Sequence, residues 1–373
     1  MAFTVRTIQA FCYRYPLAIP VVTSFGRMLN RPAVFIRAED EDGIVGWGET
    51  WSNFPSTGAE HRTRLVNEVL APALTGREFE NPVQAFEMFT QGTSVLALQC
   101  GEPGPFAQAI AGIDLALWDI FARRQRRPLW RVLGGRSGGA IKAYASGINP
   151  GGAQQTAEAA LKRGHRAMKL KVGFGAETDL ANLVALRKIV GEGMLAADAN
   201  QGWSIDQALD IVPRLGEFGL RWLEEPLRAD RPRQEWRKLR DIAPMPLAAG
   251  ENIASPEDFA HVLIEGVLDV VQPDIAKWGG LSVCGGVAND IIKSGKTFCP
   301  HYLGGGIGLL ASAHLLAGVG GDGWLEVDIN DNPLRDHFCG PVFNVSDGTV
   351  TLNEEPGLGL VPDIASIERY RRL

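Results

Sequence analysis

The most constraining feature of this chain is a regular alternation of short apolar runs and amphipathic helical segments between residues 141 and 328. Eight runs have the length and composition of buried strands: 141–146, 167–173, 194–200, 220–226, 246–251, 267–274, 296–301 and 323–328. Helical patterns lie between them, at 153–164, 177–192, 204–218, 233–242, 255–265, 281–294 and 305–318. Strands that alternate with helices form parallel sheets, and eight such units close into a barrel. The sequence therefore predicts an α/β fold of the TIM-barrel type.

The N-terminal part of the chain has a different pattern. Residues 33–38 and 44–49 are apolar runs around an acidic turn that ends in glycine, which is typical of a β-hairpin. Residues 56–130 have helical periodicity, and Ile110, Ile113, Leu117 and Ile120 define one apolar face. We therefore predict an α+β domain over residues 1–130.

The C-terminal segment falls outside the barrel pattern. With the barrel assigned to residues 131–330, the remaining segment is 331–373. It contains one short strand-like run at 349–352, which we expect to pack back on the N-terminal domain.

Polar residues recur at the ends of the predicted barrel strands. One such residue follows or closes each of seven strands, at intervals of 23 to 27 residues: Lys171, Asp198, Glu224, Glu251, Asp274, His301 and Glu326. This spacing matches one β/α unit, so all seven are expected at the same mouth of the barrel. Barrel enzymes place their active sites at the mouth formed by the carboxyl ends of the strands.

Three of these residues, Asp198, Glu224 and Glu251, come from adjacent strands. A single acid in such a position is more often a solvated surface residue, but three in phase would repel one another unless a cation neutralised them. Hard oxygen ligands with room for water and substrate favour Mg²⁺. The pattern therefore predicts a magnesium site.

Lys169 and Lys171 alternate with an apolar residue, so on a strand both side chains point to one face. Two buried ammonium groups beside a divalent cation disfavour each other's charge, and we expect this to lower the pKa of Lys171. A lysine with a lowered pKa acts as a general base near neutral pH.

His301 and Asp274 end neighbouring strands, and a carboxylate beside an imidazole fixes its tautomer and raises its basicity. Lys171 and His301 are expected on opposite sides of the barrel axis, facing the two sides of one substrate carbon. Metal binding of a substrate carboxylate would acidify its α-proton. Glu326, if protonated, would donate a hydrogen bond to the resulting enediolate.

Composition excludes several other classes. The net charge is −6, and the one basic run, at 123–131, ends a predicted helix, which argues against a nucleic-acid or membrane-surface binder. The five cysteines contain no CxxC pair, so neither a zinc framework nor a disulfide framework is expected, and a reducing cytoplasm fits best. We find no signal peptide and no membrane-spanning run in the sequence.

An ordered series of motifs, AIAGIDLALWDI, PLWRVLGG, KLK, DAN, WLEEP, GEN, QPDIAKWGG and PHYLGGGIGLLASAHLLA, resembles the mandelate racemase and muconate lactonising enzymes of the enolase superfamily. The resemblance runs from about Val5 to Pro362. It implies a capping domain, formed by the N-terminal segment and the C-terminal tail, over a modified (β/α) barrel.

The resemblance also implies a role for individual residues. Asp198, Glu224 and Glu251 would bind Mg²⁺, and Lys171 would be one base, supported by Lys169. His301, paired with Asp274, would be the other acid/base. Two further residues, Asn200 and Glu225, would lie near these groups.

Asp274 selects a branch of this family. The muconate cycloisomerase, succinylbenzoate synthase and dipeptide epimerase branch has a lysine at the end of strand six, where this chain has Asp274. The pattern is similar to the mandelate racemase branch, which includes racemases and acid-sugar dehydratases. Dehydration of an acid sugar is our first expectation; racemisation or epimerisation of a 2-hydroxy acid, cycloisomerisation of a sugar lactone, and a non-catalytic barrel remain alternatives.

Residues expected to contact the substrate come from loops near the mouth and have mixed but mainly polar character: Ser24, Arg27, Trp51 and Tyr302. Arg27 would pair with a distal carboxylate. We expect a small-molecule carboxylate as substrate, with neither nucleic acid nor membrane as partner, and a homo-oligomer between a dimer and an octamer.

Overall fold

The computed structural model describes residues 2–23, 26–136 and 138–373 of the chain. Its larger part is a barrel of eight parallel strands: β5 (Ala140–Ile148), β6 (Ala167–Lys171), β7 (Met194–Asp198), β8 (Leu223–Glu224), β9 (Leu247–Ala249), β10 (Val270–Val271), β11 (Thr297–Phe298) and β12 (Trp324–Asp328). Hydrogen-bonded ladders join them in the order β11-β10-β9-β8-β7-β6-β5-β12. Every strand lies within, or overlaps, a run identified in the sequence. The prediction of a TIM-type barrel is confirmed.

The barrel closes between β11 and β12 through polar contacts. No β-ladder joins these two strands in the part of the chain that the structure describes. Instead, the Trp324 amide donates to Cys299 Sγ (3.3 Å), and the Tyr302 amide donates to Glu326 Oε2 (3.3 Å). The loop that carries His301 is thereby tied to β12.

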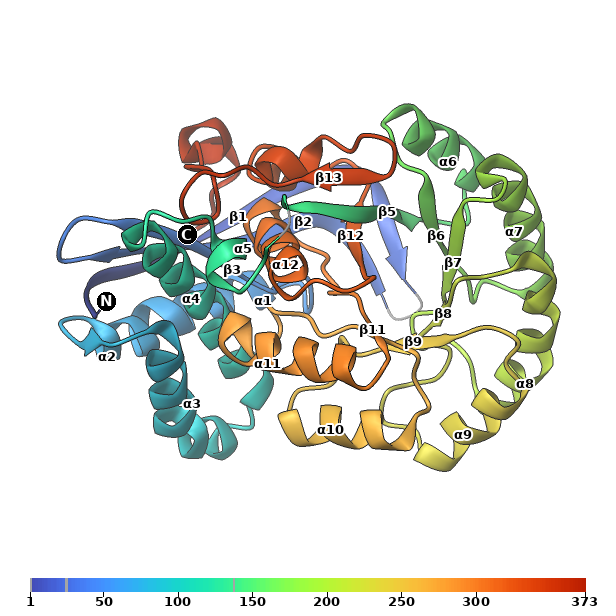
Figure 1. Cartoon of the computed structure of the whole chain (residues 1–373), viewed down its shortest axis with the longest axis horizontal. Helices are drawn as coiled ribbons and strands as arrows, with labels where there is room; N and C mark the ends of the chain where they lie inside the picture. The colour runs from blue at the N-terminus through green and yellow to red at the C-terminus, as the bar shows by residue number, and fades with distance from the viewer. Residues whose placement is uncertain (1, 24–25, 137) are drawn as a thin grey trace.

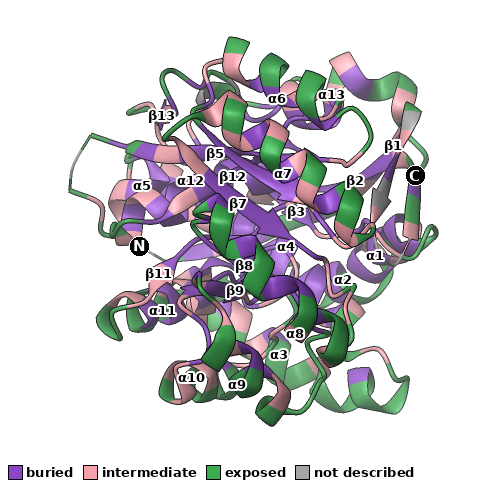
Figure 2. Ribbon diagram, turned by 90° about the vertical axis from the view of Figure 1, so that its right-hand side faces the viewer, coloured by how far each residue is buried: buried purple, intermediate pink, exposed green. Residues whose placement is uncertain are grey.

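Seven helices cover the outside of the barrel, as predicted (Figure 1). They are α6 (Ala153–Lys162), α7 (Ala176–Val190), α8 (Ile205–Arg214), α9 (Arg233–Ile242), α10 (Pro256–Glu265), α11 (Gly280–Lys293) and α12 (Gly306–Val319). Buried strands lie inside this layer and exposed helix faces lie outside it, as Figure 2 shows. Apolar helix faces packed on a buried sheet bring the strand ends together at one mouth.

The capping domain lies beside the barrel (Figure 1). Its antiparallel sheet has the order β3-β2-β1-β4, with strands β1 (Phe3–Thr23), β2 (Gly26–Asp40), β3 (Val45–Thr50) and β4 (Glu78–Phe79). The predicted hairpin corresponds to β2 and β3, where Phe35 pairs with Glu49. The β1–β2 hairpin is longer than the sequence indicated, since pairing continues to Thr23 and Gly26 after an irregularity near Pro16.

The helical part of the capping domain packs on this sheet. Its helices are α1 (Gly58–Arg64), η1 (Leu65–Leu70), α2 (Ala71–Leu74), α3 (Pro82–Gln99), α4 (Pro103–Arg124) and α5 (Leu129–Val132). The predicted apolar face of α4 is buried, including Ile113 and Ile120. Helix α4 is long and apolar enough to cross a membrane by length and composition, but 78% of its apolar stretch is buried in the domain. It is the core helix of the capping domain.

The C-terminal segment contains α13 (Pro333–Asp336), η3 (Gly340–Phe343), β13 (Thr349–Thr351) and η4 (Ile364–Tyr370). The expectation that the run at 349–352 packs on the N-terminal domain is wrong: β13 pairs antiparallel with β5 of the barrel (Figure 1). Strand β5 begins at Ala140, five residues before Ala145, its first residue paired with β6, which leaves an edge on that side for β13 to cover. The last residues do return to the capping domain, where the Arg372 amide donates to the Cys12 carbonyl (2.8 Å).

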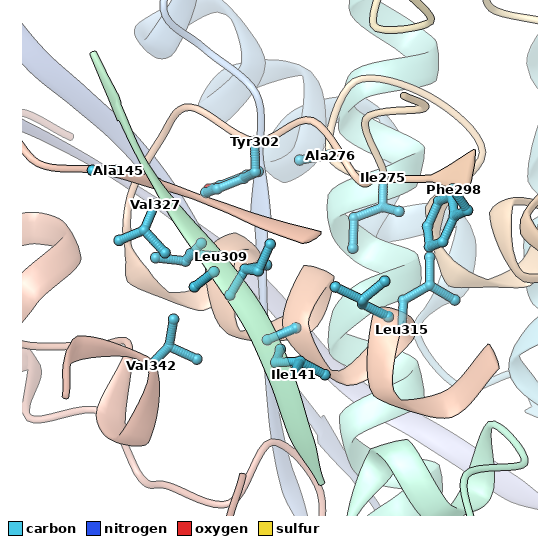
Figure 3. Close-up of a cluster of buried hydrophobic side chains, with 14 of the residues drawn as sticks. Ile141, Ala145, Ile275, Ala276, Phe298, Tyr302, Leu309, Leu315, Val327 and Val342 are labelled. Carbon is cyan, nitrogen blue, oxygen red and sulfur yellow. The ribbon is translucent and has the colours of Figure 1, made fainter. Parts of the chain in front are cut away.

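An apolar core connects the two domains. Tyr302, Leu309 and Val327 belong to one cluster that also includes residues of β2, α5 and α12 (Figure 3). Because this cluster spans barrel and capping domain, the two domains share a core, and the loops between them are held on both sides.

Candidate active site

Seven polar side chains predicted at strand ends lie at the carboxyl end of the barrel. Lys171, Asp198 and Glu224 are the last residues of β6, β7 and β8. The others follow β9, β10 and β11 or lie on β12, and they are Glu251, Asp274, His301 and Glu326. Most of these side chains are buried. The phase read from the sequence therefore brings them to one mouth.

The two lysines of β6 both point into the barrel and contact carboxylates. Lys169 Nζ lies 2.6 Å from Glu224 Oε1, 2.8 Å from Glu326 Oε1 and 3.6 Å from Asp198 Oδ2. Lys171 Nζ lies 2.5 Å from Asp198 Oδ2. Burial acts to lower the pKa of Lys171, but Asp198 and Glu224 outweigh it and raise the pKa above its usual value. The lowering expected for Lys171 supposes a divalent cation that takes over the charge of these carboxylates, so it stays a prediction.

The three acids expected to bind metal are the donor set that a hard divalent cation prefers. Each already has partners: Glu224 accepts from Gln272 Nε2 (2.7 Å), and Glu251 Oε2 lies 2.6 Å from His301 Nε2. Among the residues that the structure describes, no three Asp, Glu, His or Cys side chains converge on one coordination point. Asp198, Glu224 and Glu251 are therefore brought to one mouth, but their carboxylates turn toward the basic side chains.

The mouth carries surplus negative charge. Glu225, which adopts φ 41°, accepts from Asn252 Nδ2 (2.7 Å). Burial together with Glu251 and Asp198 raises the pKa of Glu225 well above its usual value. Six carboxylates face four basic groups: Asp198, Glu224, Glu225, Glu251, Asp274 and Glu326 against Lys169, Lys171, Lys277 and His301. With all six acids ionised and His301 protonated, the mouth would have a surplus of negative charge, and this crowding is what raises the pKa of Glu225. A divalent cation would offset it.

His301 is held by carboxylates on both ring nitrogens. Nδ1 lies 2.8 Å from Asp274 Oδ2, and Nε2 lies 2.6 Å from Glu251 Oε2. Asp274 is itself fixed, because its Oδ1 accepts from the Ala276 amide (2.9 Å) and the Lys277 amide (3.1 Å). Burial acts to lower the pKa of His301, yet Glu251 and Asp274 raise it well above its usual value. The imidazole is thus a proton donor in this arrangement.

The hydrogen bond that a protonated Glu326 would donate to the enediolate stays a prediction, and the contacts of Glu326 here favour its charged form. It accepts from Ser146 Oγ and lies 2.8 Å from Lys169 Nζ and 3.9 Å from His301 Nε2. Burial acts to raise the pKa of Glu326, but Lys169 and His301 lower it below its usual value. Glu326 is therefore an ionised acceptor that links β6 to the His301 loop.

Asn200, at φ 44°, holds Asp198: its amide donates to Oδ1 (2.8 Å) and its side chain to Oδ2 (3.2 Å). The other residue expected near the metal ligands, Glu225, lies beside Glu251. Both therefore lie where the resemblance implied.

The four residues expected to contact substrate have different locations. Lys277 Nζ lies 4.9 Å from the centre of the Trp51 ring and 3.4 Å from Glu251, so Trp51 is at the mouth. Arg27 is exposed near the end of the β1–β2 hairpin, and within the described residues no hydrogen bond or ion pair joins it to the mouth. Tyr302 turns its ring into the buried cluster of Figure 3. Ser24 lies outside the described residues.

Two buried acids of the capping domain were not identified from the sequence. Glu49 and Asp114 each accept hydrogen bonds from the first turn of a barrel helix. Nothing in their local sequence distinguishes them from solvated acids, because their partners are more than 160 residues away. The sequence feature that could have indicated them is the pair of glycine-rich runs at 279–280 and 304–306, which lie at the starts of the two helices.

A cavity of about 380 Å³ lies between α9 and α10, away from the two lysines and His301. Its walls include Trp236, Val262 and Leu268, and it reaches the mouth near Glu225 and Asn252. Charge, burial and hydrogen bonding locate the candidate chemistry at the barrel mouth.

Comparison with known families agrees with this geometry. A family model described as mandelate racemase / muconate lactonizing enzyme, N-terminal domain, matches residues 5–134, and one described as enolase C-terminal domain-like matches residues 152–366. The chain belongs to the mandelate racemase/muconate lactonizing enzyme family. The resemblance inferred from the motifs is thereby confirmed, and the chain is an enzyme of the enolase superfamily.

Solved structures of the family superpose closely. A mandelate racemase/muconate lactonizing enzyme from Bordetella bronchiseptica RB50 is 50% identical, with a TM-score of 0.94, over 99% of this chain and 100% of that one. A racemase from Streptomyces coelicolor A3(2) with bound magnesium is 27% identical, with a TM-score of 0.86, over 99% and 100% of the two chains.

Relatives with assigned activities include a cycloisomerase and a dehydratase. D-galactarolactone cycloisomerase from Agrobacterium fabrum is 28% identical over 98% of both chains. Arabinonate dehydratase from Saccharolobus solfataricus is 28% identical over 89% of both chains. Dehydratases, cycloisomerases and racemases thus share this family.

Proposed function

We propose that this enzyme removes the proton α to the carboxylate of an acid sugar and expels the β-hydroxyl group, as a hydro-lyase. The observation that carries the proposal is the pair of proton-transfer groups at the mouth. Lys171 ends β6, and His301, held by Asp274 at 2.8 Å, follows β11, with the three acids of β7, β8 and the β9 loop between them. A substrate carbon bound between them would have one such group on each face.

In this mechanism the Lys171 amine, whose pKa would fall once a cation takes over the charge of Asp198, accepts the α-proton. The electron pair of the broken C–H bond moves into the substrate carboxylate as an enediolate. The enediolate then collapses, the β-carbon–oxygen bond breaks, and the hydroxyl leaves as water with the proton donated by His301 Nε2. The enol that remains tautomerises to a 2-keto-3-deoxy acid. Asp274 holds the imidazole through Nδ1. Nε2, which lies 2.6 Å from Glu251 Oε2, would face the substrate once Glu251 holds the cation.

Asp198, Glu224 and Glu251 are the residues that would hold Mg²⁺, because they are oxygen donors on consecutive units and the mouth has surplus negative charge. The ion would neutralise these acids and stabilise the negative charge that develops on the substrate carboxylate. Lys169, buried between Glu224 and Glu326, would keep a positive charge near that carboxylate.

Cycloisomerisation of a sugar lactone is a second candidate. The relative from Agrobacterium fabrum, which matches 98% of the chain, has this activity. The same proton abstraction would then expel the ring oxygen in place of a hydroxyl group, and the product would be an isomer of the substrate.

A substrate screen tests the proposal. The purified protein with Mg²⁺ would be incubated with sugar mono- and diacids, sugar lactones and 2-hydroxy acids, and 2-keto acids would be detected as semicarbazones. We expect a keto acid from an open-chain acid sugar. A keto acid from a lactone alone would establish the cycloisomerase, and α-inversion without a keto product would contradict both and favour a racemase.

A further inference from the structure

The capping domain inserts a buried carboxylate at the start of the helix that follows His301. Glu49, on β3, is 1% exposed. Its Oε1 accepts from the Gly305 amide (2.5 Å) and its Oε2 accepts from the Gly308 amide (2.9 Å) at the first turn of α12. The Tyr302 hydroxyl lies beside this carboxylate, whose charge acts with burial to raise the pKa of Tyr302. Glu49 thus contacts the loop that begins at His301.

A second buried carboxylate of the same domain holds the helix that follows Asp274. Asp114, on α4, is 2% exposed. It accepts from the Leu281 amide (2.7 Å), the Ser282 amide (3.1 Å) and Ser282 Oγ (2.5 Å) at the first turn of α11. The two barrel helices that follow the His301–Asp274 pair are therefore each fixed by one acid from the other domain.

Burial of the Glu49 and Asp114 carboxylates costs free energy, which the hydrogen bonds from the backbone partly offset. Burial raises the pKa of Glu49 and that of Asp114 to about 7 each, although the backbone donors oppose this. The amides at a helix start favour a negative charge. The sequence also makes room for the acids: Gly280 has φ +54°, and a side chain there would meet the Asp114 carboxylate, as one at Gly305 would meet Glu49.

The capping domain also forms hydrogen bonds with the two loops that join Asp274 to α11 and His301 to α12. The Trp51 amide donates to the Ala276 carbonyl (3.0 Å), and the Ala276 amide donates to Asp274 Oδ1 (2.9 Å). On the other loop, Asn53 Nδ2 donates to the Leu303 carbonyl (2.6 Å). Capping-domain groups therefore hold each loop at its middle and at its helix end, while the strand holds its beginning.

We propose that Glu49 and Asp114 are positioning residues that set the geometry of the His301–Asp274 pair from the capping domain. They touch neither of these side chains and act through the backbone of the two loops. Their effect on activity rests on the proposed function: in that reaction they would control the step in which His301 transfers a proton. They would have little influence on proton abstraction by Lys171, whose strand carries no such contact.

The chain offers a matched control in Asp119, a third buried acid of the capping domain. Asp119 is fully buried on α4 and accepts from the Trp47 amide (2.9 Å) and the Leu358 amide (2.8 Å). It also accepts from Arg123 Nε of the same helix (2.9 Å). Its partners therefore belong to β3, α4 and the C-terminal segment, so Asp119→Asn should lower stability without reaching either loop. Glu49→Asp keeps the charge and serves if Glu49→Gln does not fold.

The first test needs no substrate. ¹⁵N-histidine NMR of the full chain would record the Nδ1–H signal of His301, identified by its loss in His301→Asn. We expect this signal to shift or broaden in Glu49→Gln and Asp114→Asn and to keep its position in Asp119→Asn. An unchanged signal in both of the first two variants would overturn the proposal, even if their thermal stability fell.

The second test uses a substrate from the screen above. We expect Glu49→Gln and Asp114→Asn to lower kcat for product formation about 10-fold, the scale seen when groups behind a functional histidine are removed, with KM unchanged. Deuterium exchange at the Lys171 face should remain. Equal losses in both processes would overturn the proposal. If no compound reacts, the proposed function fails, while the NMR result still decides the positioning role.

Discussion

His301 Nδ1 lies 2.8 Å from Asp274 Oδ2, and the other oxygen of Asp274 accepts two backbone amides at 2.9 and 3.1 Å. The imidazole is therefore held by a carboxylate that cannot rotate without losing three hydrogen bonds. This relationship explains why the two residues follow neighbouring strands, and it allows the role of each to be tested separately.

Replacing Asp274 with asparagine should leave His301 in place, but the imidazole would no longer be fixed in one tautomer. We expect kcat for product formation to fall about 10- to 100-fold, because a neutral amide does not enforce the Nδ1–H form. Rates would be measured at saturating substrate, with Asp290→Asn, an exposed residue of α11, as the control. A full rate in Asp274→Asn would show that the pair is not needed.

Magnesium binding should stabilise the protein. A ligand present at about 100 times its Kd adds about 2.7 kcal/mol to the free energy of unfolding. We expect Mg²⁺ to raise Tm in the protein treated with chelator, and Glu224→Gln to abolish the increase because it removes a carboxylate ligand. Glu217→Gln, on an exposed site, should keep it. Equal Mg²⁺ responses of Glu224→Gln and the unaltered chain would contradict the assigned ligands.

Stability toward acid should depend on His314. Its Nδ1 accepts from the Trp130 amide (3.0 Å) and its Nε2 lies 3.2 Å from the Leu358 carbonyl, and burial lowers its pKa to about 4. Unfolded histidine titrates near pH 6.5, so below that pH the unfolded state takes up a proton that the folded state refuses. The free energy of unfolding should therefore fall from pH 6.5 to pH 4 by up to about 3 kcal/mol through this residue.

The measurement for His314 is urea unfolding between pH 4 and pH 7.5. His314→Gln, whose amide can make both hydrogen bonds without titrating, should flatten the decline, whereas His261→Gln at an exposed site should not. Parallel curves for His314→Gln and the unaltered chain would refute the assignment.

Two glycines of α11 should respond to alanine with opposite signs. Gly280 has φ +54° and no room for a side chain beside Asp114, so Gly280→Ala should destabilise the chain by at least about 1 kcal/mol. Gly285 has open space around it, and Gly285→Ala should stabilise the helix by about 0.5 to 1 kcal/mol. Calorimetry would compare the two variants, and a neutral result at Gly280 would mean that the α11 turn is not as constrained as we infer.

The sequence predicts the barrel and the position of its mouth because both depend on local periodicity. The lengths of a strand and a helix set the spacing of one β/α unit along the chain. This spacing alone brings Lys171, Asp198 and His301 to one end of the barrel. The same reasoning failed for β13, since the choice between β5 and the capping sheet depends on which strand edge is left free.

Other features depend on contacts between distant segments. Glu49 and Asp114 are inconspicuous in sequence, and only the folded chain joins them to α12 and α11. The partner of Lys171 also depends on the folded chain: the strand pattern indicates a neighbouring lysine, and the structure adds Asp198, at 2.5 Å. Charge balance at a buried site has to be counted in three dimensions.

The most direct test of the central claim is α-proton exchange in D₂O with a substrate from the screen, compared between Lys171→Ala and His301→Asn. Removal of a general base typically costs 10²- to 10⁴-fold, so we expect Lys171→Ala to lose exchange by about that factor. His301→Asn should still exchange the α-proton while product formation stops. Normal exchange in Lys171→Ala would contradict the account, because the proton would then be removed by another group.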